Sequence, residues 1–396
     1  MKPRALHVLP SLSAARGGPG RVLLGLGQAL SRQQVDVTLL SGADADMLRP
    51  EDTVSLLTGR RLPLPFELPG PRLLRTMSAA IAATDLVHIH SLWNGMSTAA
   101  AWLARRHGKT IVLSAHGNLD RRGMRHRARF KRLYRACIED ANLSAVRGFH
   151  FMDEAEYEAS RWHPAVARQP CLLLPNGIDV AGIQQSLRSL PNAFAQAKGE
   201  NARAPVRLVY LGRLHVHKGI SLQLDALADL RAGGVPAQLH LIGPDHGDEA
   251  ALRRQAAALR LGESVHFHGA LYDGQRLAWL RDADAVLLTS LSEANSLTAA
   301  ETLAAGGLLV ATDSCNLQRA ADAGAVTQTP RRPAAMAAAL RRLLADAEVR
   351  RDQRAAALRY ASEQLGWDAL ALRMREFYGQ LQAASTPPVA DAGTSR

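Results

Sequence analysis

The feature that most constrains the fold of this chain is a pattern of short apolar runs alternating with helical segments, and the pattern occurs twice. In the first half, apolar runs of a strand's length occupy residues 5–9, 35–40, 85–90, 110–114 and 171–175. Segments with the three- and four-residue spacing of amphipathic helices lie between them. This alternation is typical of parallel βαβ units.

A second alternating set begins near residue 206. Its predicted strands are residues 208–211, 238–242, 265–268, 285–289 and 308–312. Its predicted helices are residues 221–231, 249–260, 274–282, 296–305 and 333–346. Between the two sets, residues 185–205 lose periodicity and gather Ser, Pro, Asn and Gly, which indicates a domain boundary. We therefore predict an α/β protein with two Rossmann-like, doubly wound domains that face a central cleft, with ligands at the carboxyl ends of the strands.

The domain boundaries follow from these patterns. We assign residues 1–184 to the N-terminal domain and residues 185–364 to the C-terminal domain, as a length of 396 residues favours two cores. An amphipathic helix is expected over residues 365–383. Residues 384–396 have little to bury and are expected to form a disordered tail.

The cysteines and the apolar runs bear on the compartment. Cys137, Cys171 and Cys315 lie far apart without a C-x2-C pair, which argues against a disulfide framework or a structural zinc and fits a reducing compartment. No apolar run reaches the roughly 18–20 residues of a membrane-spanning helix. The apolar stretch that follows the basic N-terminus is too short for an export signal. We predict a cytoplasmic protein.

The net charge of +12 biases the surface toward anions, and it is unevenly distributed. The segment from Arg121 to Arg135 holds eight Lys or Arg residues and no acidic residue. One interpretation is a solvated helix face. The other is a patch that docks on an anionic membrane surface, with Phe130, Leu133 and Tyr134 as shallow apolar anchors, so that the protein is peripheral at the inner membrane.

Two cations follow the first strand of the second set. Arg213 stands at the end of that strand after Gly212, and Lys218 with Gly219 precedes the next predicted helix. Backbone amides at a helix start, together with a guanidinium and an ammonium, form a suitable cradle for two phosphates. Taken alone, this spacing also suits an ordinary surface loop.

Two glutamates, Glu293 and Glu301, lie eight residues apart at a predicted loop-to-helix junction. A helical segment between them would separate them by about 12 Å and place them on nearly the same face. An ionised carboxylate accepts two hydrogen bonds and suits a vicinal diol, so Glu293 would hold a hexose and Glu301 a ribose. The alternative is a pair of solvent-facing glutamates on an Ala-rich helix.

Polar residues and glycines also stand at strand ends of the first set. His116 follows the strand of residues 110–114 and would reach into the cleft as a neutral hydrogen-bonding group, or else satisfy backbone groups at the strand end. His88 and His90 alternate along one strand, and we expect only His90 to face the cleft. Gly17 and Gly18 would let the first loop approach a ligand.

These motifs, in this order, resemble glycosyltransferase family 4, whose members are retaining enzymes of the GT-B fold. The resemblance runs from the Gly17-Gly18 pair to Trp367, and it is carried by six motifs at plausible spacing. The motifs are Gly17-Gly18, His116-Gly117, residues 175–179 (Pro-Asn-Gly-Ile-Asp), Gly212-Arg213 with Lys218-Gly219, Phe267-His268-Gly269, and Glu293 with Glu301.

The resemblance implies a hexosyltransferase that moves a hexose from a nucleotide-diphosphate sugar to a saccharide acceptor with retention. Whether the donor nucleotide is UDP or GDP stays open. It assigns roles to residues of this chain: catalytic, His116 and Glu293; donor diphosphate, Arg213, Lys218 and Gly18; donor sugar and ribose, Glu293, Ser296, Leu297 and Glu301; acceptor side, Gly17, His90 and Asn118. It implies no metal and no cofactor beyond the donor, and a terminal helix that crosses back onto the first domain.

His116-Gly117-Asn118 with its basic follow-on, and Ser314-Cys315-Asn316-Leu317, resemble enzymes of bacterial exopolysaccharide and lipopolysaccharide assembly, which implies a lipid-linked acceptor in cell-surface polysaccharide synthesis. This chain departs from the family at Ala294-Asn295-Ser296, where glycine and aromatic residues are usual, so sugar identity and activity stay open. The alternatives are a hydrolysing nucleotide-sugar epimerase of the same fold, or a catalytically idle sugar-nucleotide binder. A nucleic-acid protein ranks last, because no basic platform is interleaved with aromatic residues.

Overall fold

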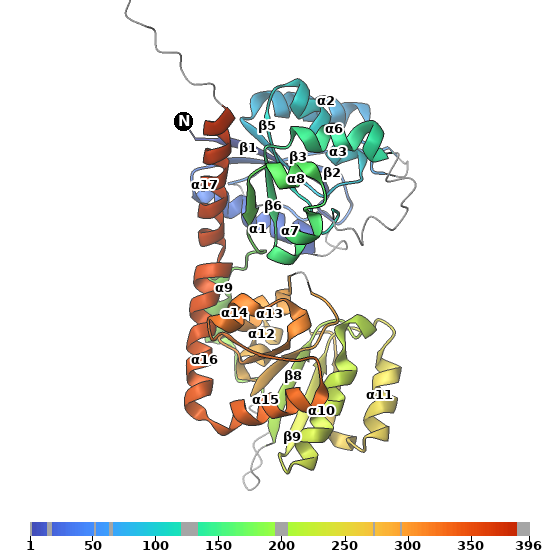
Figure 1. Cartoon of the computed structure of the whole chain (residues 1–396), viewed down its shortest axis with the longest axis vertical. Helices are drawn as coiled ribbons and strands as arrows, with labels where there is room; N and C mark the ends of the chain where they lie inside the picture. The colour runs from blue at the N-terminus through green and yellow to red at the C-terminus, as the bar shows by residue number, and fades with distance from the viewer. Residues whose placement is uncertain are drawn as a thin grey trace, which may run out of the picture. The chain divides into compact units, whose positions relative to one another are not determined.

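A computed structural model describes residues 2–13, 18–50, 53–62, 66–119, 134–194, 205–271, 274–293 and 295–385 of the chain (Figure 1). Several residues that the sequence singles out lie outside the described residues. These are Gly17, Ala294, residues 121–133 of the basic segment and residues 386–396 of the predicted tail.

The chain divides into two compact units. The first consists of residues 1–177 and 367–396, and the second of residues 178–366. The sequence places the boundaries at residues 184–185 and 364–365 instead. The difference at the first boundary arises because helix α9 (Val180–Ser189) packs against helices of the second unit, through residues such as Leu187 in that unit's core.

The first unit is built on a seven-stranded parallel sheet in the order β3-β2-β1-β4-β5-β6-β7. Its strands are β1 (Arg4–Ser11), β2 (Asp36–Gly42), β3 (Ser55–Gly59), β4 (Leu86–His90), β5 (Thr110–Ser114), β6 (Gly148–Phe151) and β7 (Cys171–Leu173). Its helices are α1 (Gly18–Arg32), α2 (Pro71–Ala83), α3 (Gly95–Arg106), α6 (Asp140–Ala145), α7 (Glu154–Ser160), α8 (Pro164–Arg168) and α17 (Trp367–Ser385). Both faces of the sheet are covered, as parallel sheets require.

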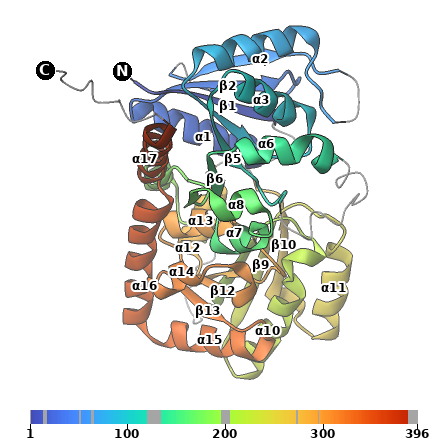
Figure 2. The same cartoon turned by 45° about the horizontal axis from the view of Figure 1, so that its top comes forward.

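Helix α17 closes one face of the first unit by packing alongside α1 (Figure 2). Its Leu370, Met374 and Tyr378 are buried with Leu26 and Leu30 of α1 in one core. Trp367, the first residue of α17, occupies the space beside Gly25, where a Cβ atom would come closer to the indole ring than real Cβ atoms do. The last helix is therefore an integral part of the first unit.

The second unit is built on a six-stranded parallel sheet in the order β10-β9-β8-β11-β12-β13. Its strands are β8 (Val206–Leu211), β9 (Ala237–Ile242), β10 (Val265–Gly269), β11 (Ala285–Leu288), β12 (Leu309–Thr312) and β13 (Val326–Thr329). Its helices are α9, α10 (Ile220–Ala232), α11 (Glu249–Ala258), α12 (Gln275–Asp282), α13 (Leu297–Ala304), α14 (Gln318–Asp322), α15 (Pro333–Ala345) and α16 (Ala347–Tyr360). This strand order is that of a Rossmann fold.

The predicted fold class, two doubly wound parallel α/β domains, is confirmed. The sequence analysis missed three strands, β3, β6 and β13. For two of them the reason is local. Strand β6 has only four residues and begins with a glycine, and in β13 Val326 is followed by polar Thr327 and Gln328 instead of an apolar run.

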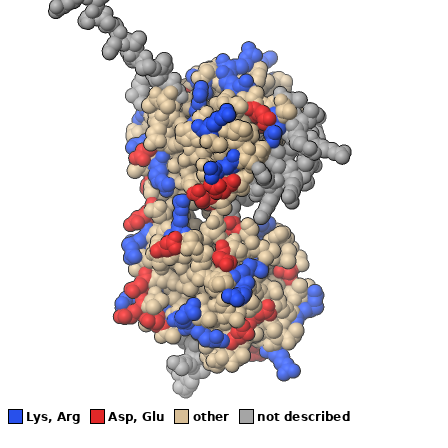
Figure 3. Space-filling view, viewed as in Figure 1, with Lys and Arg blue, Asp and Glu red and all other residues tan. Residues whose placement is uncertain are grey.

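The described surface mixes both signs of charge. On the face shown in Figure 3, Lys and Arg side chains are scattered among Asp and Glu side chains over both units. Within the described ranges, no helix combines the length and the apolar character that crossing a membrane requires.

Candidate functional site

The centre of the second sheet brings two loops together. Strands β8 and β11 are neighbours, and the strand order reverses between them. In open parallel sheets, the carboxyl ends of the strands at such a reversal are the usual place for a ligand. The loop that follows β8 carries Arg213 and Lys218, and the loop that follows β11 carries Glu293.

Hydrogen bonds to backbone carbonyl oxygens connect the loops after β8 and β11. The backbone N–H of Leu291 donates to the carbonyl oxygen of His217 (2.9 Å). The Thr289 hydroxyl lies 3.1 Å from the Lys218 carbonyl oxygen and 3.0 Å from that of Gly219. Gly219 has φ 62°, and a Cβ there would come closer than 3.0 Å to the Thr289 carbonyl oxygen. Residue 219 must therefore be glycine for the loops to approach this closely.

An ion pair joins the two loops at their tips. Lys218 Nζ lies 2.5 Å from Glu293 Oε1, and the Ser290 hydroxyl donates to the same oxygen at 2.6 Å. The side chain of Glu293 is only 11% exposed and that of Lys218 is 26% exposed. Because partial burial strengthens the attraction between the charges, this pair holds both side chains in place. The structure thus brings together two of the predicted site residues.

Glu301 lies on α13 and is paired with Arg276 of α12. Arg276 Nη2 lies 2.5 Å from Glu301 Oε1, and Arg276 Nε lies 3.3 Å from Oε2, a two-pronged contact. The sequence analysis did not single out Arg276. No spacing motif could have identified it, because the contact joins two helices that are separate in sequence.

The start of α13 differs from the prediction. The helix begins at Leu297, one residue after the predicted start at Ser296, and Glu293 stands in the loop before it. The estimate of 12 Å between the two glutamates assumed a helical segment throughout, and that assumption is wrong. Ser296 is the N-cap of α13, and its Oγ accepts a hydrogen bond from the Ala299 backbone N–H (3.2 Å). Leu297, the first residue of the helix, is 43% exposed.

Arg213 is exposed at the end of β8, and among the described residues no hydrogen bond of its guanidinium group is found. Its backbone carbonyl accepts a hydrogen bond from the Tyr210 hydroxyl (2.8 Å), which holds the backbone in place at this residue. Helix α10 begins at Ile220, directly after Lys218 and Gly219. Its free backbone N–H groups add partial positive charge beside the two cations.

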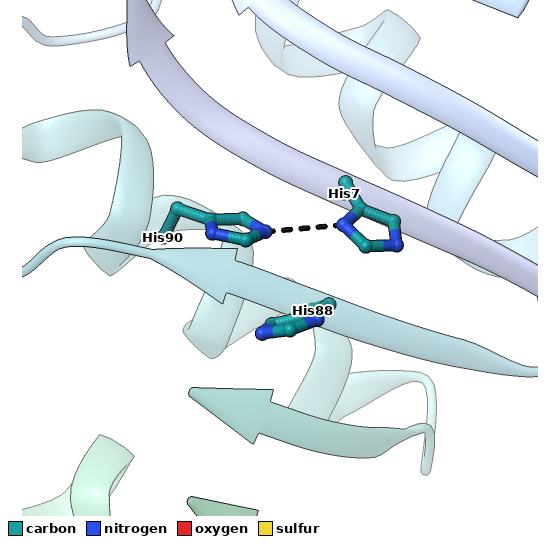
Figure 4. A group of neighbouring side chains, drawn as sticks. All are labelled: His7, His88 and His90. Carbon is teal, nitrogen blue, oxygen red and sulfur yellow. Dashed lines mark hydrogen bonds between the residues drawn. The ribbon is translucent and has the colours of Figure 1, made fainter. Parts of the chain in front are cut away.

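The first unit holds a different cluster, made of buried histidines. His7 of β1 and His88 and His90 of β4 lie side by side in the sheet (Figure 4). His7 Nδ1 lies 3.1 Å from His90 Nε2, and the rings of His88 and His90 stack with their centroids 4.3 Å apart. The expectation that only His90 faces the cleft assumed that His88 and His90 point to opposite faces of the sheet. That assumption is wrong, because residues two apart in a strand point to the same face, and the two rings stack on each other.

His116 continues this cluster at the end of β5. Its backbone has φ 50°, a left-handed conformation that is rare outside glycine, and its Nε2 lies 3.2 Å from His90 Nδ1. The next residue is held by a buried carboxylate, since the Gly117 backbone N–H donates to Glu156 Oε1 at 2.5 Å. Burial raises the pKa of Glu156, and its backbone hydrogen bonds oppose that shift.

Asn118 ties the loop after β5 to the loop after β4. Its side-chain Nδ2 donates to Ser91 Oγ (3.1 Å) and to the Ala115 carbonyl oxygen (3.0 Å). Its backbone carbonyl oxygen accepts from Trp93 Nε1 (2.8 Å). The side-chain amide nitrogen is thus already engaged within the unit. Gly18, the only glycine of the Gly17-Gly18 motif among the described residues, is the first residue of α1.

The five histidines in and beside this cluster are held in the neutral form. Burial, followed by repulsion from His150, lowers the pKa of His7 to about 3 and that of His116 to about 4. Burial also lowers the pKa of His150 to about 4 and moves those of His88 and His90 well below 6.5. At neutral pH these rings therefore act as uncharged hydrogen-bonding groups.

Acid should destabilise the first unit through these histidines. The unfolded chain binds protons near pH 6.5 and the folded unit does not. The contribution of these histidines to the free energy of unfolding is therefore fully present above pH 6.5 and is lost as the pH falls toward 4. Each histidine contributes a slope of about 1.4 kcal/mol per pH unit in that window. Calorimetry from pH 7 to pH 5 checks this. His150→Gln should flatten the slope, and exposed His246→Gln should not; a pH-independent melting temperature would contradict the account.

The nitrogens of His7, His88 and His90 lie within 4.8 Å of one another, a separation at which three imidazoles could share a metal ion. A metal ligand needs a free lone pair, whereas both nitrogens of His88 are hydrogen-bonded, one to Tyr378 and one to Ser114. The residues present therefore fit a hydrogen-bonded cluster better than a metal centre.

Comparison with known proteins places this fold. The structure matches the solved structure of Anabaena HepE in complex with UDP with a TM-score of 0.70, 15% identity, and coverage of 95% of this chain and 100% of the other. The family described as "Glycosyl transferase 4-like domain" matches residues 17–177, and "Glycosyl transferases group 1" matches residues 193–360. The chain belongs to the GT-B glycosyltransferases.

Two curated relatives come from Mycobacterium tuberculosis. Glycogen synthase is 34% identical over 177 residues, which are 44% of this chain and 42% of that protein, so the match spans less than half of its length. A GDP-mannose-dependent alpha-(1-6)-phosphatidylinositol dimannoside mannosyltransferase is 29% identical over 286 residues, which are 71% of this chain and 70% of that protein. The name of the first relative specifies glycogen, whereas that of the second specifies GDP-mannose and a phosphatidylinositol dimannoside.

Proposed function

We propose that this GT-B glycosyltransferase is a retaining hexosyltransferase that transfers a hexose from a nucleotide-diphosphate sugar to a saccharide acceptor. The observation that carries the proposal is the ion pair between Lys218 and Glu293 at the strand reversal of the second sheet. This pair lies where Rossmann sheets bind nucleotides, and an ammonium suits a phosphate as a carboxylate suits sugar hydroxyls, which supports the proposal.

The donor's diphosphate is assigned to Arg213, Lys218 and the N-terminus of α10. Arg213 is exposed, and the Lys218 ammonium has three N–H donors, of which the contact with Glu293 uses one. A cation and a helix N-terminus stabilise the negative charge that grows on a leaving diphosphate. Gly18, at the start of α1, is kept as a further candidate for the diphosphate by family resemblance.

The donor's sugar and ribose are assigned to the two glutamates. Glu293 Oε2 is not used by Lys218 or Ser290, whose contacts are to Oε1, so one oxygen is open to hexose hydroxyls. Glu301 would hold the ribose while Arg276 fixes its orientation. Ser296 and Leu297 stand between them at the start of α13, where the exposed Leu297 offers an apolar contact.

The catalytic step is proposed by analogy with the family. The leaving group departs from the face on which the acceptor attacks, and the donor phosphate takes the acceptor's proton, which gives retention. His116 and Glu293 are the catalytic candidates. Gly17, His90 and Asn118 are the candidates for the acceptor side, although His90 is buried and Asn118 bonds within the unit, so a contact from either needs rearrangement or must act through a neighbour.

For the acceptor we propose a lipid-linked saccharide at the cytoplasmic face of the inner membrane, in cell-surface polysaccharide synthesis. Support comes from the sequence resemblance and from the relative whose name specifies a phosphatidylinositol dimannoside. The basic segment from Arg121 to Arg135 supplies the proposed membrane contact. Its last residue is already engaged, since Arg135 Nε lies 3.0 Å from Asp140 Oδ1 and its guanidinium lies over Trp162, so docking would depend on the other cations.

A thermal-shift screen of UDP-, GDP- and ADP-sugars tests donor binding. One nucleotide series should raise the melting temperature, since a ligand at about a hundred times its Kd stabilises by about 2.7 kcal/mol. Glu301→Ala should reduce the shift, and Glu249→Ala, which alters an exposed pair with Arg253 on α11, should leave it intact.

Turnover of the stabilising donor then separates the alternatives. Glycosylated product extracted from membranes supports the transferase, free epimerised sugar indicates a hydrolysing epimerase, and binding with neither indicates an idle binder. No shift with any nucleotide sugar contradicts the proposal.

A further inference from the structure

The interior of the first unit contains an unbroken chain of hydrogen-bonded polar groups that ends at His116. Seven hydrogen bonds link its members. In order, the chain runs through Leu174, His150, Ser114, His88, Tyr378, His7, His90 and His116. Of these residues only His116 is partly exposed, and the others are buried.

The first bonds of this chain have only one possible direction. The Leu174 carbonyl oxygen carries no proton, so His150 Nε2, which lies 2.8 Å away, must donate to it. A neutral imidazole has one N–H, so His150 Nδ1 accepts, and its partner at 2.7 Å, the Ser114 hydroxyl, donates. The Ser114 oxygen then accepts from His88 Nε2 (2.7 Å).

The Tyr378 hydroxyl of α17 sets the direction of the next bonds in the same way. Because His88 Nε2 holds the proton, His88 Nδ1 accepts from the Tyr378 hydroxyl (2.6 Å). The Tyr378 oxygen therefore accepts from His7 Nε2 (3.3 Å), and His7 Nδ1 accepts from His90 Nε2 (3.1 Å). The last bond runs from His116 Nε2 to His90 Nδ1 (3.2 Å).

We propose that this directed chain, anchored at the Leu174 carbonyl, fixes His116 as the Nε2–H tautomer and presents its Nδ1 lone pair as a hydrogen-bond acceptor. Among the described residues, His116 Nδ1 has no hydrogen-bond partner. Resting on the proposed function, we assign this atom to a hydroxyl group of the bound sugar. Tyr378, Ser114 and His150 are then positioning residues, which act on the sugar only through His116.

Two features of the unit support this assignment. Reversing the chain would turn a lone pair of His150 Nε2 toward the Leu174 carbonyl oxygen, two acceptors at 2.8 Å, which is repulsive. Burial also keeps the rings neutral, as the lowered pKa values of His7, His116 and His150 indicate, so each of these rings carries a single N–H proton.

Long-range ¹H–¹⁵N NMR of protein labelled at histidine measures the tautomers directly at pH 7.5. In the wild type, the five rings should all be Nε2–H, with each signal assigned by its loss in a single His→Gln variant. Tyr378→Phe and Ser114→Ala each interrupt the chain. A buried N–H without its acceptor is unfavourable, so each variant should raise the ratio of Nδ1–H to Nε2–H at His116 roughly tenfold. Tyr157→Phe, on α7 outside the chain, is the matched control.

The outcomes separate this proposal from the proposed function. An Nδ1–H form of His116 in the wild type overturns the chain, as does an unchanged ratio in whichever interrupting variant folds, whatever the enzymatic result. Fixed tautomers in a wild type that transfers no sugar support the chain and reject the transferase. Where transfer is measurable, Tyr378→Phe should lower kcat more than it changes the KM for the donor.

Discussion

Glu293→Gln should lower the rate of sugar transfer by at least about a hundredfold while the protein stays folded. Removing one preorganised polar group that stabilises developing charge, such as an oxyanion-hole donor, typically lowers kcat by about 10²–10³-fold. Glutamine keeps the size of the side chain and removes the negative charge of the carboxylate, to which Lys218 and the Ser290 hydroxyl both donate. Lys218 is partly exposed, so water solvates the ammonium that loses its partner.

The measurement is initial-rate kinetics with the donor that binds, together with a melting curve for each variant. Glu249→Gln is the matched control, since it makes the same change in the same unit at an ion pair with Arg253 that lies on α11. Its rate should equal that of the wild type. A Glu293→Gln enzyme that retains a third or more of the wild-type rate would contradict the role given to this carboxylate.

Gly219→Ala should destabilise the second unit by about 3 kcal/mol or more, the sum of a strained backbone and an overlap with fixed atoms. Gly219 has φ 62°, and a Cβ would press on the Thr289 carbonyl oxygen, which belongs to backbone and has no room to move. For a unit of this size, the loss corresponds to a melting temperature lower by about 6–12 °C. The shift would also carry Lys218 away from Glu293, so donor binding should weaken with stability.

Gly234→Ala separates the two contributions. Gly234 also has positive φ (81°), but nothing lies within 4 Å of a Cβ built there. This control therefore carries the backbone strain alone and should cost about 1 kcal/mol. Equal melting temperatures for the two variants would show that the loops after β8 and β11 do not meet as closely as described.

The fold was predictable from sequence because its strands are buried on both faces. Strands such as β8 and β12 read as near-continuous apolar runs, and the glycines and polar residues between runs mark their ends. Of the three strands that were missed, β6 is short and begins with Gly148, and β13 is short and carries polar residues. Their place in the sheet is set by neighbouring strands, which local sequence does not specify.

The candidate site was predictable only as far as its residues follow strand ends. Lys218 and Glu293 were found because motif position and strand order both place them at the same edge. Arg276 was missed because its link to Glu301 is a contact between helices. The histidine chain was missed because it depends on Tyr378, whose hydroxyl reaches His88 from a helix 290 residues away in sequence.

The structure of the protein bound to its nucleotide sugar tests the central claim most directly. The account predicts the diphosphate beside Lys218 and Arg213, with a ribose hydroxyl about 3 Å from a carboxylate oxygen of Glu301 and a hexose hydroxyl equally near Glu293. A donor bound with none of these groups in contact would contradict the account, even if the protein transferred sugar.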